Sequence, residues 1–227
     1  MSFGKLESRY RIRGEIETLT PLHIGSGMEE KFSSADLPIV ITRDGRPYIP
    51  GSSLKGVVRS YAERVLKAVK PSEKVERLVK VTFGYSERED SQASKLIFRD
   101  CLTDSPLKDY RWSVRINRKT KTADSRGLFS YEFVPPGTKF LLEIIGENLS
   151  LPELGVLCVG LRPLVEGDGA IGGCKSRGLG AVKLAINSVE RVLPEHYINP
   201  TKGTEQFDWS VLEERALSAL REELGVT

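Results

Sequence analysis

The chain has few of the residues that build disulfide frameworks or metal centres. Its 227 residues include three cysteines and two histidines. Cys101, Cys158 and Cys174 are odd in number, widely spaced and form no CxxC pair, which argues against a disulfide framework or a zinc site. Two isolated histidines, His23 and His196, cannot supply a histidine-rich metal site.

Long apolar runs are also absent. The longest, residues 154–161, is far shorter than the ~20 apolar residues of a membrane-spanning helix. No apolar stretch follows the basic residues near the N-terminus, so we expect no signal peptide and predict a cytoplasmic protein without a membrane partner. Gln occurs twice and Asn four times, whereas Lys, Arg and Glu are abundant, a balance typical of thermophilic proteins.

The charge of the chain is unevenly distributed. The whole sequence has 34 basic and 31 acidic residues, a net charge of +3, but residues 187–227 hold four basic and eight acidic residues. The tail therefore carries −4 and the remainder +7. A basic body favours a polyanionic partner. With 39% hydrophobic and 29% charged residues, the composition excludes wholesale disorder and fits one large domain with insertions.

The apolar periodicity predicts an α+β protein. Strands are expected at 9–19, 93–102, 139–145 and 181–192, a hairpin at 110–135, and helices at 53–70, 71–81, 151–165 and 208–224. Ser52 or Ser53 is the predicted N-cap of the first helix. Without insertions the order is β-α-β-β-α-β, a ferredoxin-like core shared with RNA-recognition motifs. We expect a domain over 1–192, with insertions at about 25–50 and 109–135, and a C-terminal extension over 193–227 with a tail helix.

A glycine-rich stretch over 167–180 precedes the last predicted strand. Dense glycine exposes backbone N–H groups to an anion, and two cations lie in the same stretch. A flexible connection is the alternative, and Cys174 stands where a P-loop would need glycine. The predicted phosphate contacts of this stretch are Gly172, Gly173, Lys175, Ser176, Arg177 and Gly178.

Two further segments combine positive charge with features suited to RNA. Residues 109–127 hold six basic and two acidic side chains beside two aromatic residues, a combination that suits single-stranded nucleic acid, although a solvated hairpin is the alternative. Its predicted RNA contacts are Arg115, Arg118, Lys119 and Lys121. Ser52, Ser53 and Lys55 would place hydroxyls and an ammonium at a helix N-terminus, a second predicted anion site.

Four motifs in chain order together resemble the RAMP superfamily of CRISPR-associated proteins, with the strongest likeness to the backbone subunit of type III effector complexes. They lie at 20–25, 48–59, 93–100 and 172–180, and the likeness spans about residues 8–190. The resemblance implies a modified RNA-recognition fold with a thumb-like hairpin. It also implies guide RNA bound through residues that include Arg59, complementary target RNA, other effector subunits and stacking in a helical array.

The resemblance also bears on catalysis. In that family a loop aspartate upstream of a proline cleaves target RNA with a divalent metal, and Asp36, ahead of Pro38, occupies this place. Asp36 is therefore the candidate catalytic residue and ligand of Mg or Mn; without catalysis no cofactor is expected. Two alternatives stay open: a repeat-processing endoribonuclease that uses His23 as acid–base catalyst, and a non-catalytic RNA-binding scaffold.

Overall fold

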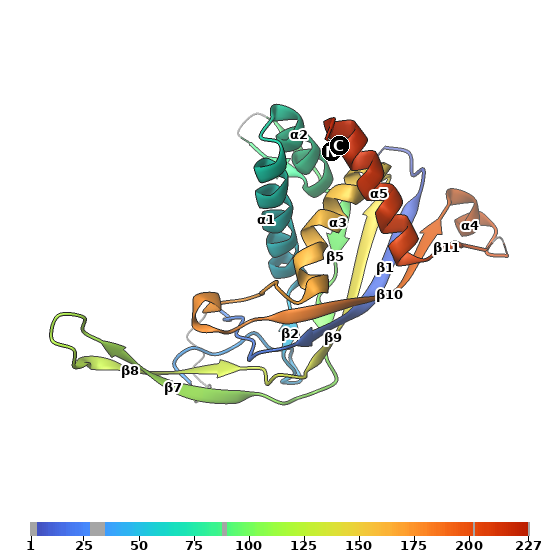
Figure 1. The fold of residues 1–227 in the computed structure, drawn as a ribbon. Coiled ribbons are helices and arrows are strands. Elements are labelled where there is room, and N and C mark those ends of the chain that lie inside the picture. The colour runs from blue at the N-terminus through green and yellow to red at the C-terminus, as the bar shows by residue number, and fades with distance from the viewer. Residues whose placement is uncertain (1–3, 28–34, 88–89, 202, 227) are drawn as a thin grey trace.

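The computed structural model describes residues 4–27, 35–87, 90–201 and 203–226. Its main sheet has five strands in the order β11-β10-β1-β9-β5, and each adjacent pair is antiparallel. The strands are β1 (Arg9–Thr18), β5 (Leu96–Phe98), β9 (Lys139–Glu147), β10 (Val182–Val192) and β11 (Glu205–Phe207). Figure 1 shows helices along one face of this sheet and a long hairpin projecting from its lower end.

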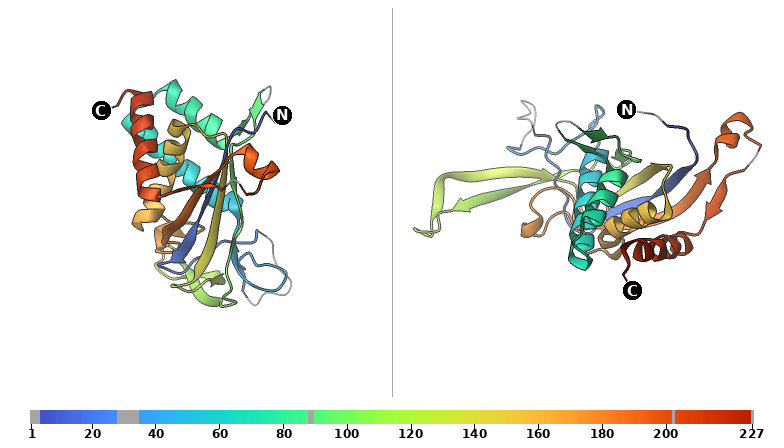
Figure 2. Two further views of the ribbon diagram at one scale, coloured as in Figure 1. Left: turned by 90° about the vertical axis from the view of Figure 1, so that its right-hand side faces the viewer. Right: turned by 90° about the horizontal axis from the view of Figure 1, so that it is seen from above.

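The central strand β1 shows why the sheet has an apolar face. Tyr10, Ile12 and Ile16 alternate with charged residues, and all three are buried in the core. The helices α1 (Gly51–Val69), α2 (Glu73–Phe83), α3 (Leu151–Glu166) and α5 (Trp209–Leu224) bring their apolar sides to the same core (Figures 1 and 2). The structure is thus a mixed α and β fold with an antiparallel sheet.

The intervening residues of β1 carry charges that the neighbouring strands compensate. The ion pairs are Arg9–Glu147, Arg11–Glu190, Arg13–Glu190 and Arg13–Glu143, with N–O separations of 2.5 to 3.4 Å. Because these guanidinium groups already have carboxylate partners, this side of the sheet offers little net charge to a polyanion.

The tail is integrated into the main body. Leu212, Ala216, Leu220 and Leu224 are buried, as their spacing predicts, and α5 packs on α3. A Cβ on Gly155 of α3 would lie 2.6 Å from the carbonyl oxygen of Ala216, so glycine permits this close approach. The strand β11, which the sequence did not predict, pairs with β10 and extends the sheet.

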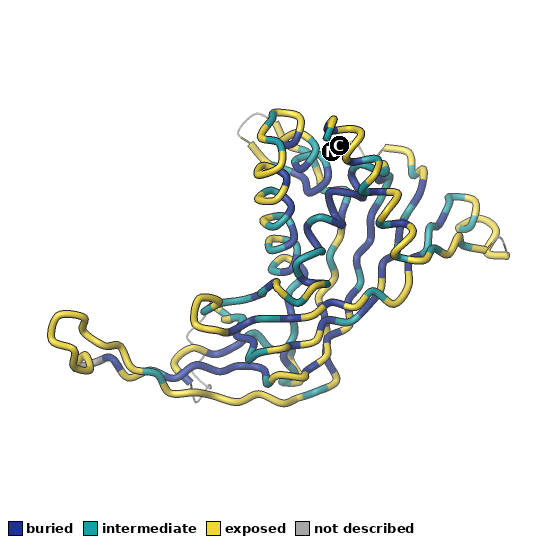
Figure 3. The backbone as a smooth tube through the Cα atoms, in the orientation of Figure 1, coloured by how far each residue is buried: buried dark blue, intermediate teal, exposed yellow. Residues whose placement is uncertain are grey.

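The predicted hairpin is confirmed as β7 (Asp109–Ile116) and β8 (Ala123–Phe133), with Trp112 opposite Ser130. It projects beyond the sheet, and most of its length is exposed (Figures 2 and 3). At its base, Tyr131 and Phe133 pack with Leu179 in a small cluster of their own. The hairpin is therefore anchored at one end and free along most of its length.

The capping prediction for α1 is wrong. The helix begins at Gly51, Pro50 is the N-cap residue, and no side chain caps it. The Gly51 N–H instead donates to the Asp100 carboxylate at 2.8 Å. Ser52 and Ser53 consequently lie inside the first turn.

The strand predicted at 93–102 is divided. Only β5 joins the main sheet, whereas β6 (Cys101–Leu102) pairs with β2 (Tyr48–Ile49). The sequence also missed three short elements: the strands β3 (Tyr85–Ser86) and β4 (Ser91–Gln92), and the helix α4 (Pro194–Ile198). Across the described ranges, no helix is long and apolar enough to cross a membrane.

Candidate nucleic-acid interface

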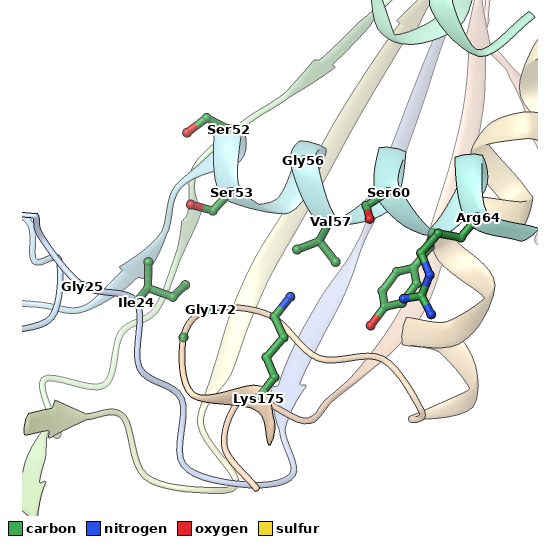
Figure 4. A pocket seen from close by; sticks show the side chains of 12 residues that line it. Ile24, Gly25, Ser52, Ser53, Gly56, Val57, Ser60, Arg64, Gly172 and Lys175 are labelled. Carbon is green, nitrogen blue, oxygen red and sulfur yellow. The ribbon is translucent and has the colours of Figure 1, made fainter. Parts of the chain in front are cut away.

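A cavity of about 550 Å³ lies between the first turns of α1 and the glycine-rich stretch, and we call it the α1 cavity (Figure 4). One wall comes from α1, and the other from residues near the end of β1 and from the glycine-rich stretch. Its lining residues are Ile24, Gly25, Ser52, Ser53, Gly56, Val57, Ser60, Tyr61, Arg64, Gly172, Gly173 and Lys175. These residues, all in described parts of the chain, include two cations and no acid.

The α1 wall combines small polar side chains with the positive end of a helix. Ser52 and Ser53 lie in the first turn, where their hydroxyls can donate to an anion, while the Gly51 N–H of the same turn already donates to the Asp100 carboxylate. Figure 4 shows Lys175 extending from the opposite loop toward α1, with Arg64 on α1 farther along the cavity. Both long cations and the helix N-terminus therefore face one space, an arrangement that suits consecutive phosphates.

The glycine-rich stretch is held in place against the segment that follows β1. The Gly173 N–H donates to the His23 carbonyl at 2.8 Å, and the Gly180 N–H donates to the Pro21 carbonyl at 2.9 Å. Gly172 has φ +84°, and a Cβ there would lie 2.3 Å from the His23 carbonyl oxygen. Only glycine fits this position, so the stretch is a shaped wall of the cavity.

A single turn of 3-10 helix, η1 (Lys175–Arg177), divides the two cations of this stretch between two cavities. Lys175 lines the α1 cavity. Arg177, two residues later, lines a second cavity of about 840 Å³ beside β7, which we call the hairpin cavity. Ser176 and Gly178 are exposed on the same turn.

The hairpin cavity contains the candidate catalytic residue. Asp36 lies there with three guanidinium groups, those of Arg115, Arg118 and Arg177; Leu37, Ser113, Val114, Ile116 and Phe129 complete the lining. The Asp36 Oδ2 accepts hydrogen bonds from the Ser130 N–H at 2.7 Å and the Ser130 hydroxyl at 3.1 Å. These bonds, the backbone one first, lower the pKa of Asp36, which is therefore ionised.

The structure gives Asp36 no preassembled metal centre. No group of three or more His, Cys, Asp or Glu side chains suited to a metal occurs among the residues that the structure describes. One carboxylate is nevertheless compatible with Mg²⁺, which keeps several waters and binds through one or two carboxylates plus substrate phosphates. Asp36 is the acid in this lining, so a metal held here would take its further ligands from RNA and water.

His23 is buried, with 8% of its surface exposed. Its Nδ1 lies 2.7 Å from the Glu132 carbonyl oxygen, and its ring meets Tyr131 edge-on at 5.9 Å between centroids. The His23 carbonyl accepts from the glycine-rich stretch, as described above. These contacts join the segment after β1 to β8 and to the glycine-rich stretch.

Among the described residues, four other predicted RNA contacts line neither cavity: Lys55, Arg59, Lys119 and Lys121. Arg59 donates to Glu63 at 2.8 Å and to the Gly84 carbonyl at 2.9 Å. Burial, followed by repulsion from Arg59, lowers the pKa of Lys55. Lys119 and Lys121 lie exposed at the hairpin tip. The structure thus brings Ser52, Ser53 and Lys175 together but not Lys55 or Arg59.

The far half of the α1 cavity was not predicted from the sequence. Ser60, Tyr61 and Arg64 follow Ser53 and Val57 along one side of the helix, at steps of three and four residues. The Tyr61 hydroxyl also accepts from the Ala170 N–H at 2.9 Å, which fixes the start of the glycine-rich stretch against α1. The helical spacing was visible in the sequence, but the partner wall was not.

The fold and these two cavities define an α+β protein with a projecting hairpin and basic cavities at its base. The profile of the RAMP superfamily matches residues 15–183. The chain belongs to the RAMP superfamily.

Two curated proteins are similar to this chain over most of its length. A protein of Enterococcus italicus named "CRISPR system Cms endoribonuclease Csm3" is 30% identical over 206 residues, which cover 82% of this chain and 94% of the relative. A protein of the same name from Methanothermobacter thermautotrophicus is 31% identical over 228 residues, covering 85% and 90%.

Two solved structures share the fold. A chain of the type III-B Cmr-beta complex in its apo state superposes with a TM-score of 0.63 at 18% identity, and the match covers 78% of this chain and 96% of that one. A chain of the Cmr-beta complex bound to cognate target RNA gives 0.60 at 16% identity, with the same coverage.

Proposed function

We propose that this chain is an RNA-holding backbone subunit of a type III CRISPR effector complex, and that it also cuts target RNA paired to the guide. The relatives named as Csm3 endoribonucleases and the likeness to chains of Cmr-beta complexes, one of them bound to target RNA, support this. The α1 cavity carries the proposal, because it joins a helix N-terminus, two cations and a glycine wall.

The guide RNA occupies the α1 cavity. Lys175 and Arg64 neutralise phosphates, and the hydroxyls of Ser52 and Ser53 add donors beside the positive end of α1. Contacts of this kind read the backbone and carry no sequence information. A subunit that must hold guides of different sequence needs binding of this type.

The target strand occupies the hairpin cavity. Arg115, Arg118 and Arg177 bind its phosphates, and the ionised Asp36 faces the strand that is cut. In this cleavage the 2′-oxygen next to the scissile phosphate bonds to phosphorus while the bond from phosphorus to the 5′-oxygen breaks. The hydroxyl proton passes to the Asp36 carboxylate, the leaving 5′-oxygen takes a proton from water, and the charge on the phosphate must be neutralised. A divalent metal, Mg or Mn, held by Asp36 and RNA phosphate, supplies charge neutralisation when bound. The arginines hold the phosphate and add to that neutralisation.

His23 serves a structural role in this proposal. Its burial and its contacts with Glu132 and the glycine-rich stretch leave it as a support for both cavities rather than an acid–base group. These contacts favour the backbone-subunit proposal over the alternative of repeat processing by His23. A non-catalytic scaffold remains the outcome if Asp36 does not act on RNA.

We also propose a ferredoxin-like core for residues 1–192, with 193–227 as an extension. The order β10-β1-β9-β5 supports this arrangement, since α1 follows β1 and α3 follows β9 in the chain.

The projecting hairpin exposes Trp112, Ile116 and Leu128, which need a receiving surface on a like subunit. Such a head-to-tail contact builds open helical arrays. Light scattering with RNA should then show species larger than dimers.

RNA affinity as a function of salt tests the proposal. We expect the affinity for single-stranded RNA to fall at least tenfold as the salt concentration rises from about 50 to about 200 mM. We also expect the chain to show little preference for RNA sequence. Lys175→Ala should reduce the slope of log affinity against log salt by about 0.7, the value for one phosphate contact on a single strand. Lys183→Ala, an exposed lysine on β10, is the control and should leave the slope unchanged. Equal slopes for both variants would contradict the assignment of the α1 cavity.

A further inference from the structure

The loop that carries Asp36 is fastened to strand β8 of the hairpin. The Leu37 N–H donates to the Ser130 carbonyl at 3.0 Å, and the Glu132 N–H donates back to the Leu37 carbonyl at 3.0 Å. The Ile39 N–H donates to the Glu132 carboxylate at 3.2 Å. Through these bonds the position of Asp36 follows the position of β8.

Ser130 forms the most direct part of this connection. Its N–H and its hydroxyl both donate to Asp36 Oδ2, at 2.7 and 3.1 Å, and the same hydroxyl oxygen accepts from the Asp36 N–H at 3.1 Å. Ser130 thus forms hydrogen bonds with both the backbone and the side chain of Asp36. Neither bond to the carboxylate uses Oδ1.

Ser130 cannot reach RNA itself, because only 1% of its surface is exposed. Any effect of its hydroxyl on cleavage must therefore pass through Asp36. A hydrophobic residue of similar size would fill the same space but would leave the Asp36 N–H without this acceptor and the carboxylate held by the backbone N–H of residue 130 without the hydroxyl. Catalytic groups lose most of their effect when they move by about 1 Å from the productive position.

We propose that Ser130 is the positioning residue that fixes the Asp36 carboxylate to the hairpin, so that the site of cleavage follows the position of the hairpin on the RNA. This inference rests on the proposed role of Asp36 as the catalytic group. It assigns a function to a buried strand serine that lies 94 residues away in the sequence.

Two substitutions at Ser130 test the inference in the assembled complex with guide RNA, complementary RNA and Mg²⁺. Ser130→Ala removes the hydroxyl with little change in volume, and Ser130→Thr retains it. We expect Ser130→Ala to slow single-turnover cleavage by about 10- to 100-fold. Its affinity for complementary RNA should stay within about twofold of the parent. Ser130→Thr should keep most of the parent rate. Ser188→Ala, an exposed serine on β10, is the control for the same chemical change in a strand.

The outcomes separate this inference from the proposed function. If the parent cuts, Asp36→Ala does not, and Ser130→Ala cuts at the parent rate, the inference alone is overturned. It is also overturned if Ser130→Ala loses RNA affinity in proportion to rate, or if Ser130→Thr is no faster than Ser130→Ala. A parent that does not cut, or an Asp36→Ala variant that cuts normally, overturns the proposed catalysis and this inference with it.

Discussion

Substituting Gly172 by alanine should damage the glycine wall of the α1 cavity far more than the same change at Gly178. Both residues have positive φ, +84° and +82°, so alanine is strained at either position. They differ in their surroundings, because a Cβ at Gly178 meets nothing within 4 Å. Comparing the two alanine variants therefore distinguishes the cost of backbone strain, which both share, from the cost of the close contact between residue 172 and His23.

The structure gives the size of the difference. Left-handed backbone costs an L-residue about 1–2 kcal/mol, which is the whole expected effect at Gly178. At Gly172 the new Cβ would also lie 2.3 Å from the His23 carbonyl oxygen, so that the two segments must separate by about 1 Å. This separation strains the 2.8 Å hydrogen bond from the Gly173 N–H to the same oxygen, worth about 1 kcal/mol. We expect Gly172→Ala to cost about 2–3 kcal/mol in total.

Chemical denaturation and RNA binding together check this prediction. Gly172→Ala should lower the free energy of unfolding by about 1 kcal/mol more than Gly178→Ala. It should also weaken guide RNA binding by about tenfold in the folded protein, more than Gly178→Ala does. If the two variants unfold within about 0.5 kcal/mol of one another, the contact between the glycine-rich stretch and His23 is not what holds this wall.

Three further predictions concern other parts of the molecule. Asp36→Ala should abolish metal-dependent cleavage of guide-paired RNA and leave guide binding intact, since removing an acid from a basic cavity does not weaken polyanion binding; a mutant that cuts like its parent excludes Asp36. Burial raises the pKa of Cys101 to about 12 and raises that of Cys158 further, so a thiol reagent should modify Cys174 first in the native protein and all three thiols after unfolding. Rapid modification of all three thiols in the native protein would contradict the burial of Cys101 and Cys158 in the core. Leu220→Ala should cost about 2–5 kcal/mol in the free energy of unfolding, because α5 belongs to the main core, and a near-neutral result would make the tail dispensable.

Much of the fold could be predicted from the sequence because apolar residues recur at regular spacing in its strands and helices. The alternation of Tyr10, Ile12 and Ile16 predicted β1, and the spacing of Leu212 and Leu220 predicted α5, since each pattern matches one buried face. The three residues of β11 form no such pattern and become a strand only because β10 presents an edge to them.

The candidate sites were predictable in part. Glycine density with Lys175 identified one wall of the α1 cavity, and Ser52 and Ser53 identified the other. Arg59, which the resemblance selected as an RNA contact, lies outside the lining of the α1 cavity and donates to Glu63 and to the Gly84 carbonyl. Side-chain direction on a helix decides such cases, and it depends on where the neighbouring elements pack.

The anchoring of Asp36 could not be predicted from the sequence. Its partner Ser130 lies 94 residues away, and strand serines have no distinctive local pattern. Only the fold brings the loop of Asp36 beside β8. The same holds for the division of Lys175 and Arg177 between two cavities, which depends on the single turn of η1.

The most direct test of the account is the RNA that accompanies the chain in its native cell. The tagged chain should be purified under gentle conditions, and the RNA that comes with it extracted, sized and sequenced beside a tag-only control. We expect RNAs of discrete length that carry CRISPR repeat sequence, and we expect Gly172→Ala to reduce their recovery. Recovery of partner proteins with no RNA above the control would contradict the claim that this subunit holds guide RNA.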